Sequence, residues 1–241
     1  MKTSLDKIVH AKVIESALTA LSKSQNLDFH EVASESKTDL STVSKILEPF
    51  LCERPSHGFL KVSLAIEAVR LGEDPQRIAR LLSWRELEIY TATLCRLTGL
   101  RSKSGVRITL DGKRAEVDVL ASSPSLCLVI DCKRWNKTLS GEILKTIVEQ
   151  VKHRTQVIKT FFERKFRGVG IVYFAPVVVS LYEPVSRKFD DVFIVPVTSI
   201  KGFLLSVENV LSGLVYRANL DHRWVLFFEE DTLNQSLDRW R

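Results

Sequence analysis

The stretch Ser125-Leu-Cys-Leu-Val-Ile-Asp-Cys-Lys133 decides the interpretation of this chain. Its run of apolar residues at 126–130 favours a strand that is buried on both faces of a sheet. Side chains alternate along a strand, so Asp131 and Lys133 share one face while Cys132 lies on the other. A buried strand that ends in a carboxylate and an amine, two residues apart, is typical of a strand that leaves the core at a functional site.

The segment before it, Ala115-Glu-Val-Asp-Val-Leu120, predicts a second strand that also carries acidic residues on one face. If the two strands pair, Asp118 lies close to Asp131. Two carboxylates that converge at a sheet end repel strongly unless a cation lies between them. Hard oxygen ligands select Mg²⁺ or Mn²⁺ over zinc, with Lys133 as the adjacent positive group.

The flanking sequence predicts a mixed α/β domain around these two strands. A capping box at Ser83 and Glu86 opens a helix, which Gly99 ends. The pair Asp111-Gly112 predicts a tight hairpin. Further strands are expected at 107–110, 169–175, 192–199 and 223–230, and further helices at about 140–166 and 200–212.

The N-terminal part predicts a different, mostly helical unit. Helices are expected at about 5–23, 28–37, 41–51 and 61–71, with a short strand at 59–63 after the turn cluster RPSHG. This is the winged-helix layout, which can contact DNA or another protein. If this domain contacts DNA, the helix expected at 41–51 approaches it through Ser41, Thr42, Ser44 and Lys45. We therefore expect a winged-helix domain at 1–72, a helical linker at 73–83, an α/β domain at 84–215 and a C-terminal extension at 216–241.

The composition indicates what kinds of partner the protein can have. The formal net charge is +6 and the sequence pI about 9.2, which favours a polyanionic partner such as DNA. No apolar run approaches the ~18–20 residues of a membrane helix, so a soluble, cytoplasmic protein with no membrane contact is expected. Four cysteines without zinc spacing are expected to be reduced thiols.

The two acidic strands resemble a known superfamily. Asp118, followed thirteen positions later by Asp131-Cys132-Lys133, is similar to the signature of the PD-(D/E)XK nucleases, and Asp131–Trp135 looks like the motif of Mrr-type restriction endonucleases and their archaeal relatives. The resemblance covers about residues 84–200. After Lys133 the chain departs from the Mrr type, because its helix at 140–166 is longer and more basic and the later phenylalanine-threonine pattern is not evident.

The resemblance implies a restriction-endonuclease-like mixed sheet flanked by helices and a metal-dependent DNA endonuclease. It adds a glutamate in the helix before the sheet, for which Glu88, eleven residues ahead of Gly99, is the candidate. The implied catalytic set is Glu88, Asp118, Asp131 and Lys133. Mg²⁺ or Mn²⁺ is expected on Asp118, Asp131, the carbonyl of Cys132 and Glu88. Gln150 and Lys152 are expected to support the metal site. Arg134, Arg154 and the basic helix are expected to contact DNA. A homodimer is expected, because cutting both strands needs two sites.

Other interpretations stay open. Asp131 and Lys133 also fit an ordinary ion pair where a strand meets solvent, and the basic helix fits a solvated face. The same residues suit a non-catalytic DNA-binding protein on a nuclease scaffold, or a structure-selective nuclease such as a Holliday junction resolvase. An RNA nuclease is less favoured, because winged helices more often bind duplex DNA.

Overall fold

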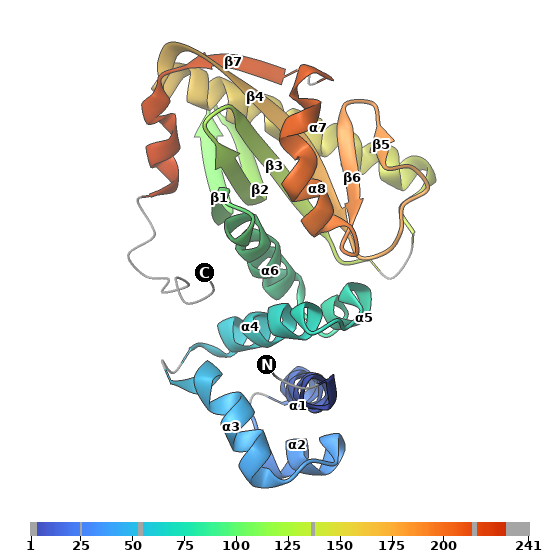
Figure 1. Cartoon of the computed structure of the whole chain (residues 1–241). Coiled ribbons are helices and arrows are strands. Elements are labelled where there is room, and N and C mark those ends of the chain that lie inside the picture. Colours follow the sequence, from blue (N-terminus) through green and yellow to red (C-terminus); the bar gives the residue numbers. More distant parts are fainter. Residues whose placement is uncertain (1–3, 25, 53–54, 136–137, 214–215, 230–241) are drawn as a thin grey trace. The chain divides into compact units, whose positions relative to one another are not determined.

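The computed structural model describes residues 4–24, 26–52, 55–135, 138–213 and 216–229, with the backbone alone at 210–212 (Figure 1). The chain divides into two compact units, Met1–Tyr90 and Thr91–Arg241. The division falls inside helix α6 (Trp84–Leu97), the helix predicted to open at Ser83. Gly99, with a positive φ of 91°, follows its end, as expected.

The described residues of the first unit form helices and the turns that join them, and no strand is found among them. Its helices are α1 (Ser4–Lys23), α2 (Phe29–Ser36), α3 (Leu40–Leu51), α4 (His57–Arg70), α5 (Pro75–Ala79) and the start of α6. The side chains of Asp28, Asp39 and Asp74 each accept a hydrogen bond from a main-chain N–H in the first turn that follows, which begins α2, α3 and α5. Fully buried residues of α1, α2 and α3 form the core, among them Ile14, Leu18, Val32, Val43 and Leu47.

The strand predicted at 59–63 is wrong, because these residues lie inside α4. Five residues taken alone resemble a strand, but the longer segment has the helical repeat. Leu60, Leu64 and Ala68, four residues apart, are all buried on one face. The two strands of a wing are therefore not found in the part of this unit that the structure describes. What remains of the predicted layout is α2, a tight turn at Lys37–Asp39 and α3.

The second unit is a mixed sheet flanked by helices, as predicted. Its described strands are β1 (Arg101–Leu110), β2 (Lys113–Ser123), β3 (Leu126–Lys133), β4 (Arg167–Ser180), β5 (Lys188–Phe189), β6 (Val192–Pro196) and β7 (Tyr216–Leu220). The order is β1-β2-β3-β4-β6-β5, with β7 also paired to β4. The first three strands form an antiparallel meander, and β3, β4 and β6 run parallel.

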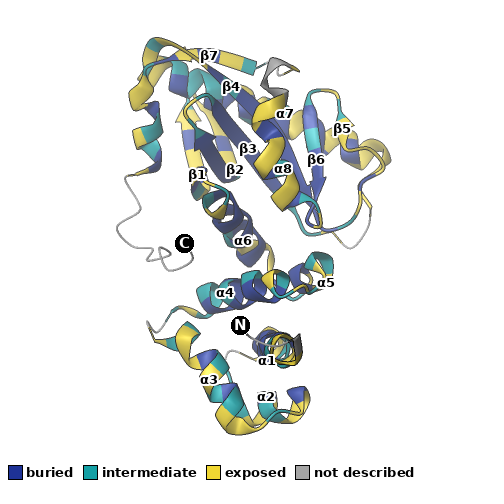
Figure 2. Cartoon of the chain, viewed as in Figure 1, coloured by how far each residue is buried: buried dark blue, intermediate teal, exposed yellow. Residues whose placement is uncertain are grey.

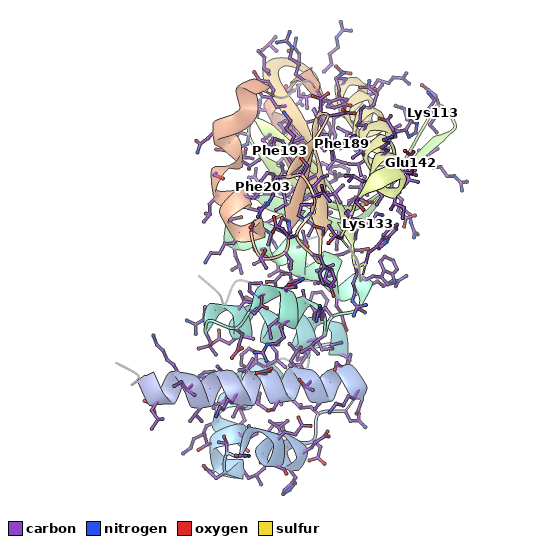
Figure 3. All side chains as sticks on the ribbon, turned by 90° about the vertical axis from the view of Figure 1, so that its right-hand side faces the viewer. Lys113, Lys133, Glu142, Phe189, Phe193 and Phe203 are labelled. Carbon is purple, nitrogen blue, oxygen red and sulfur yellow. The ribbon has the colours of Figure 1, made fainter. Side chains whose placement is uncertain are left out.

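Two helices cover the sheet. Helix α7 (Gly141–Lys165) makes the crossover from β3 to the parallel β4, and α8 (Ile200–Ser206) lies on the opposite face, as Figures 1 and 3 show from two directions. The buried residues of α7 pack on the sheet along its length, with Ile147 and Val148 near one end and Ile158 and Phe162 near the other. Figure 2 shows the central strands as the most buried part of this unit.

The hairpin between β1 and β2 is confirmed. Asp111 and Gly112 both have positive φ, 50° and 75°, which is the conformation that a two-residue type I′ turn requires. Leu110 pairs with Lys113 directly across that turn. The Asp-Gly turn therefore sets the register of β2, and with it the position of Asp118.

The strand expected at 223–230 is wrong where the structure describes it. His222–Phe228 is a 3₁₀ helix, whose Trp224 and Phe228 are buried four residues apart against the core. Phe162 of α7 packs edge-on against Trp224, with ring centroids 5.6 Å apart. The helix expected at 200–212 is α8 followed by a 3₁₀ helix at Val207–Gly213. No helix within the described ranges is both long and apolar enough to cross a membrane.

Candidate functional site

Asp118 lies where β2 and β3 separate. The last residues that pair across these strands are Val119 and Ile130. One step beyond, the main-chain N–H of Cys132 donates a hydrogen bond to Asp118 Oδ2 at 2.6 Å. A side-chain carboxylate thus takes the place of a main-chain acceptor at the end of the ladder. This bond holds Asp118 at the end of β3, beside the Asp131-Cys132-Lys133 motif.

Asp131 is a buried carboxylate with two cationic partners. Its side chain belongs to a residue that is only 3% exposed. Lys133 Nζ lies 2.7 Å from Asp131 Oδ2, and the guanidinium of Arg154, on α7, donates to Asp131 Oδ1. Lys133 is labelled in Figure 3. Burying a carboxylate this deeply is tolerated only with such partners.

The two carboxylates interact electrostatically. Burial, and then the negative charge of Asp131, raise the pKa of Asp118 to about 6, against the lowering effect of the Cys132 N–H and the charges of Lys133 and Arg154. The hydrogen bond from Cys132 N–H to Asp118 and the contact of Lys133 with Asp131 thus bring Asp118, Asp131 and Lys133 together. A positive charge beside both carboxylates would relieve their repulsion.

Arg154 also lines a shallow hollow of about 560 Å³ beside this cluster. The hollow lies along α7 and the start of β2, and its lining residues are Arg114, Lys145, Thr146, Glu149, Gln150, His153 and Arg154. Gln150, predicted to support the site, is therefore in this hollow. Lys152 instead contacts Glu149 at 2.9 Å and Asp190 at 3.5 Å.

The contact between Arg154 and Asp131 was missed by sequence reasoning, which expected Arg154 only as a DNA contact. No local signal could have identified it, because the two residues are 23 positions apart and meet only when α7 folds back across the sheet. Arg114 was missed for the same reason. It belongs to β2 and contributes to the hollow only through the packing of α7 beside that strand.

Glu88 is buried, at 8% exposed, and belongs to the first compact unit, whereas the two aspartates belong to the second. Its part in the site stays a prediction. Three residues along α6, Thr91 Oγ1 lies 3.6 Å from the thiol of Cys132, which donates to it. The capping box is present: Ser83 N–H donates to Glu86 Oε2 at 2.6 Å, and Glu86 N–H to Ser83 Oγ at 3.3 Å. Glu86 is thus engaged with the helix start, as expected.

The predicted DNA-contacting residues of the first unit lie along α3. Ser41 and Lys45 are exposed and Thr42 and Ser44 partly so, while Val43 and Leu47 hold the helix to its core. Asp39 accepts a hydrogen bond from Thr42 N–H, and its pKa is lowered by hydrogen bonding at Thr42. In the second unit Arg134, the other predicted contact, is partly buried just after β3.

The donor set fits a hard divalent cation only in part. Two carboxylates and the carbonyl of Cys132 are oxygen ligands of the kind that Mg²⁺ and Mn²⁺ prefer. Throughout the described ranges, however, no group of three or more His, Cys, Asp or Glu side chains is placed to hold a metal. A cation at this position would therefore take side-chain oxygens from these two carboxylates alone, and Asp131 would have to exchange at least one of its cationic partners to offer one.

No family model, curated protein or solved structure matches this chain. Its function is therefore inferred from the motif and from the geometry of the motif's residues.

Proposed function

We propose that this chain is a metal-dependent nuclease that hydrolyses phosphodiester bonds in DNA, on a restriction-endonuclease-like sheet. One observation carries the proposal. Two carboxylates from neighbouring strands, Asp118 and Asp131, converge where the strands separate, beside Lys133 and with Arg154 reaching in from α7. The raised pKa of Asp118 supports it, because clustered carboxylates at an elevated pKa are typical of sites that take up a cation or a proton.

In this proposal Asp118, Asp131 and the carbonyl of Cys132 would hold Mg²⁺ or Mn²⁺. A divalent cation there supplies Lewis-acid chemistry, which activates water and offsets charge on the phosphate. Lys133 pairs with Asp131 at 2.7 Å and its side chain is 20% exposed, so this side chain is accessible to a substrate. It orients the attacking water and stabilises the negative charge that develops on phosphorus.

DNA is the proposed substrate because cationic groups flank the acidic pair. Arg154, Arg114 and Lys145 line the hollow beside Asp131, and the chain as a whole carries a formal charge of +6. In the first unit, α2, the turn and α3 form a helix-turn-helix arrangement that presents Ser41 and Lys45 to solvent. We assign DNA contact to this exposed side of α3, in place of the complete winged-helix domain that the sequence suggested.

Nicking of supercoiled plasmid, with and without Mg²⁺ or Mn²⁺, tests the proposal. We expect metal-dependent cleavage by the wild type, none by Lys133→Ala, and nearly equal DNA affinity for both. The matched control is Lys159→Ala on α7. Lys159 is 17% exposed and pairs with one carboxylate, that of Glu163, at 2.8 Å, much as Lys133 pairs with Asp131. Undiminished cleavage by Lys133→Ala, or equal loss in both variants, would contradict the assignment.

A second function, a non-catalytic DNA-binding protein on the same scaffold, is favoured by one observation. Both oxygens of Asp131 are engaged by protein cations, Lys133 and Arg154, which is also the geometry of a structural ion pair. DNA binding without cleavage of plasmid, flap, junction or single-stranded substrates in either metal would establish this second function. Cleavage confined to junctions would instead identify a structure-selective nuclease.

A further inference from the structure

Arg154 belongs to two arrangements at once. Its guanidinium donates to Asp131 Oδ1 at the acidic pair, and the same residue lines the basic hollow along α7. Its side chain is 27% exposed, whereas that of Asp131 is 4% exposed. The arginine is therefore accessible to a solute that enters the hollow, while the carboxylate it holds is not.

The hollow has the chemistry of an anion site. Arg114, Lys145 and His153 line it together with Arg154. Its acidic residue, Glu149, is already engaged by Lys152 at 2.9 Å, and Lys145 contacts Glu142 at 2.7 Å. A phosphodiester suits these donors, because a guanidinium binds a phosphate through two parallel hydrogen bonds and a lysine binds it as a point charge.

We propose that Arg154 is a positioning residue that couples the binding of a DNA backbone phosphate in this hollow to the binding of a divalent cation at Asp131. Without DNA, Arg154 occupies Asp131 and keeps cation affinity low. A phosphate in the hollow competes with Asp131 for the guanidinium of Arg154. When the guanidinium leaves Asp131, it exposes an oxygen of that carboxylate. The inference rests on the proposed function, whose metal site it regulates.

The coupling requires that Arg154 bind either Asp131 or the phosphate, and not both at once. Asp131 keeps Lys133 when Arg154 leaves, so the buried carboxylate is not left without a cation. A coupling of this kind is reciprocal: DNA must raise the affinity for the cation by the same factor by which the cation raises the affinity for DNA, commonly about 5- to 150-fold.

The first experiment measures Mn²⁺ binding to the full chain without DNA. Electron paramagnetic resonance of the free ion reports how much Mn²⁺ stays unbound. We expect Arg154→Gln to bind Mn²⁺ about tenfold or more tightly than the wild type, and Arg154→Lys to fall between them. The matched control is Arg164→Gln. Arg164 lies on the same helix and pairs with a single carboxylate, Asp111, at 2.7 Å, so the charge change is equal. Unchanged or weaker Mn²⁺ binding by Arg154→Gln would overturn the proposal.

The second measurement separates coupling from the simple removal of a positive charge. The affinity for a fluorescent duplex with hydrolysis-resistant phosphorothioate linkages is measured by anisotropy, with and without Mn²⁺. Mn²⁺ should strengthen binding at least about fivefold in the wild type and in Arg164→Gln, and only slightly in Arg154→Gln. Equal strengthening in all three would mean that Arg154 carries no coupling.

These readouts distinguish the two proposals. If Arg154→Gln gains Mn²⁺ affinity and loses the coupling, yet the wild type cuts no DNA, the coupling stands and the nuclease proposal falls. If the wild type cuts DNA but Arg154→Gln binds Mn²⁺ no better, the nuclease stands and the coupling falls. Absence of Mn²⁺ binding in every variant overturns both.

Discussion

The main-chain N–H of Cys132 is hydrogen-bonded to Asp118 Oδ2 at 2.6 Å, across the end of the β2–β3 ladder. This bond holds a partly buried carboxylate next to Asp131, although the two negative charges repel. A protein gains no stability from such an arrangement. It is typical of sites that sacrifice stability for function.

Replacing Asp118 by asparagine should stabilise the metal-free protein above pH 6. Burial and Asp131 raise the pKa of Asp118 to about 6 from an ordinary value of 3.8, so its charged form costs folding free energy at neutral pH. The contribution of the protonated Asp118 to the free energy of unfolding is therefore fully present below pH 3.8 and is lost as the pH rises to about 6. The substituted amide keeps an acceptor for Cys132 N–H without the charge. We expect a gain of about 1–3 kcal/mol at pH 8, and almost none at pH 4, in urea unfolding.

The control for that experiment is Glu116→Gln. Glu116 lies on the same strand, is exposed, and pairs with Arg107 at 2.9 Å, so the same loss of charge removes no buried repulsion. If Asp118→Asn is no more stable than wild type at pH 8, or is equally stabilised at both pH values, the pKa of Asp118 is not raised in the native state.

Gly168 should tolerate no side chain. A Cβ built there would lie 2.2 Å from the main-chain N of Asp221 and 2.4 Å from the carbonyl carbon of Leu220. These are main-chain atoms at the end of β7, where Asp221 N–H donates to Phe166 O at 2.7 Å. Gly168→Ala must therefore separate β4 from β7. We expect a loss of about 3 kcal/mol or more in the free energy of unfolding, as in severe overpacking.

Gly202→Ala provides the comparison. Gly202 lies inside α8, and an added Cβ would meet nothing within 4 Å. Alanine is there expected to stabilise the helix by about 0.5–1 kcal/mol. If both substitutions changed stability alike in thermal unfolding, the close approach of the two strands at Gly168 would be contradicted.

The sequence predicted most of the second unit because its signals are local. The apolar run before Asp131 and the Asp-Gly turn at 111–112 each specify their element within a few residues. The errors arose where short apolar segments suit two structures. At 59–63 and at 223–229, burial at helical spacing overrode β propensity, as Leu60 with Leu64 and Trp224 with Phe228 show.

The part of the candidate site that neighbouring strands bring together could be predicted from the sequence. Asp118 faces Asp131 because adjacent strands in this register must place them close. Arg154 could not be assigned to Asp131, because the two residues are 23 positions apart and their contact depends on how α7 packs on the sheet. A sequence pattern specifies which face of a helix is buried, but not which strand end that face meets.

Lys61 should be essential for the stability of the first unit. It is 5% exposed and its Nζ lies 2.7 Å from Glu86 Oε2. Burial raises the pKa of Glu86, but the hydrogen bonds from Lys61 and Ser83 outweigh that effect and lower it overall. Lys61→Met leaves this carboxylate buried without its cation, at a cost of about 3–5 kcal/mol at pH 7.

The pH dependence gives that prediction its sign. Because the folded pKa of Glu86 is depressed, the stability that it contributes is present above the unfolded pKa and is lost as the pH falls through the folded value. The difference between wild type and Lys61→Met should therefore shrink on acidification, and Glu86→Gln added to Lys61→Met should recover part of the loss at pH 7. A difference that is the same at pH 4 and pH 7 would mean that Lys61 acts through packing alone.

Lys45, exposed on α3, should contribute to DNA affinity through a phosphate if α3 contacts DNA. Each phosphate that a lysine neutralises adds about 0.9 to the slope of log K against log salt on duplex DNA, because it releases condensed counterions. Lys45→Gln should therefore lower the slope by about 1 and weaken binding for all sequences alike. The control is Lys23→Gln at the end of α1, where the lysine is exposed and pairs with Glu35 at 3.2 Å. Identical slopes for Lys45→Gln and wild type, in anisotropy titrations at several salt concentrations, would mean that Lys45 makes no phosphate contact.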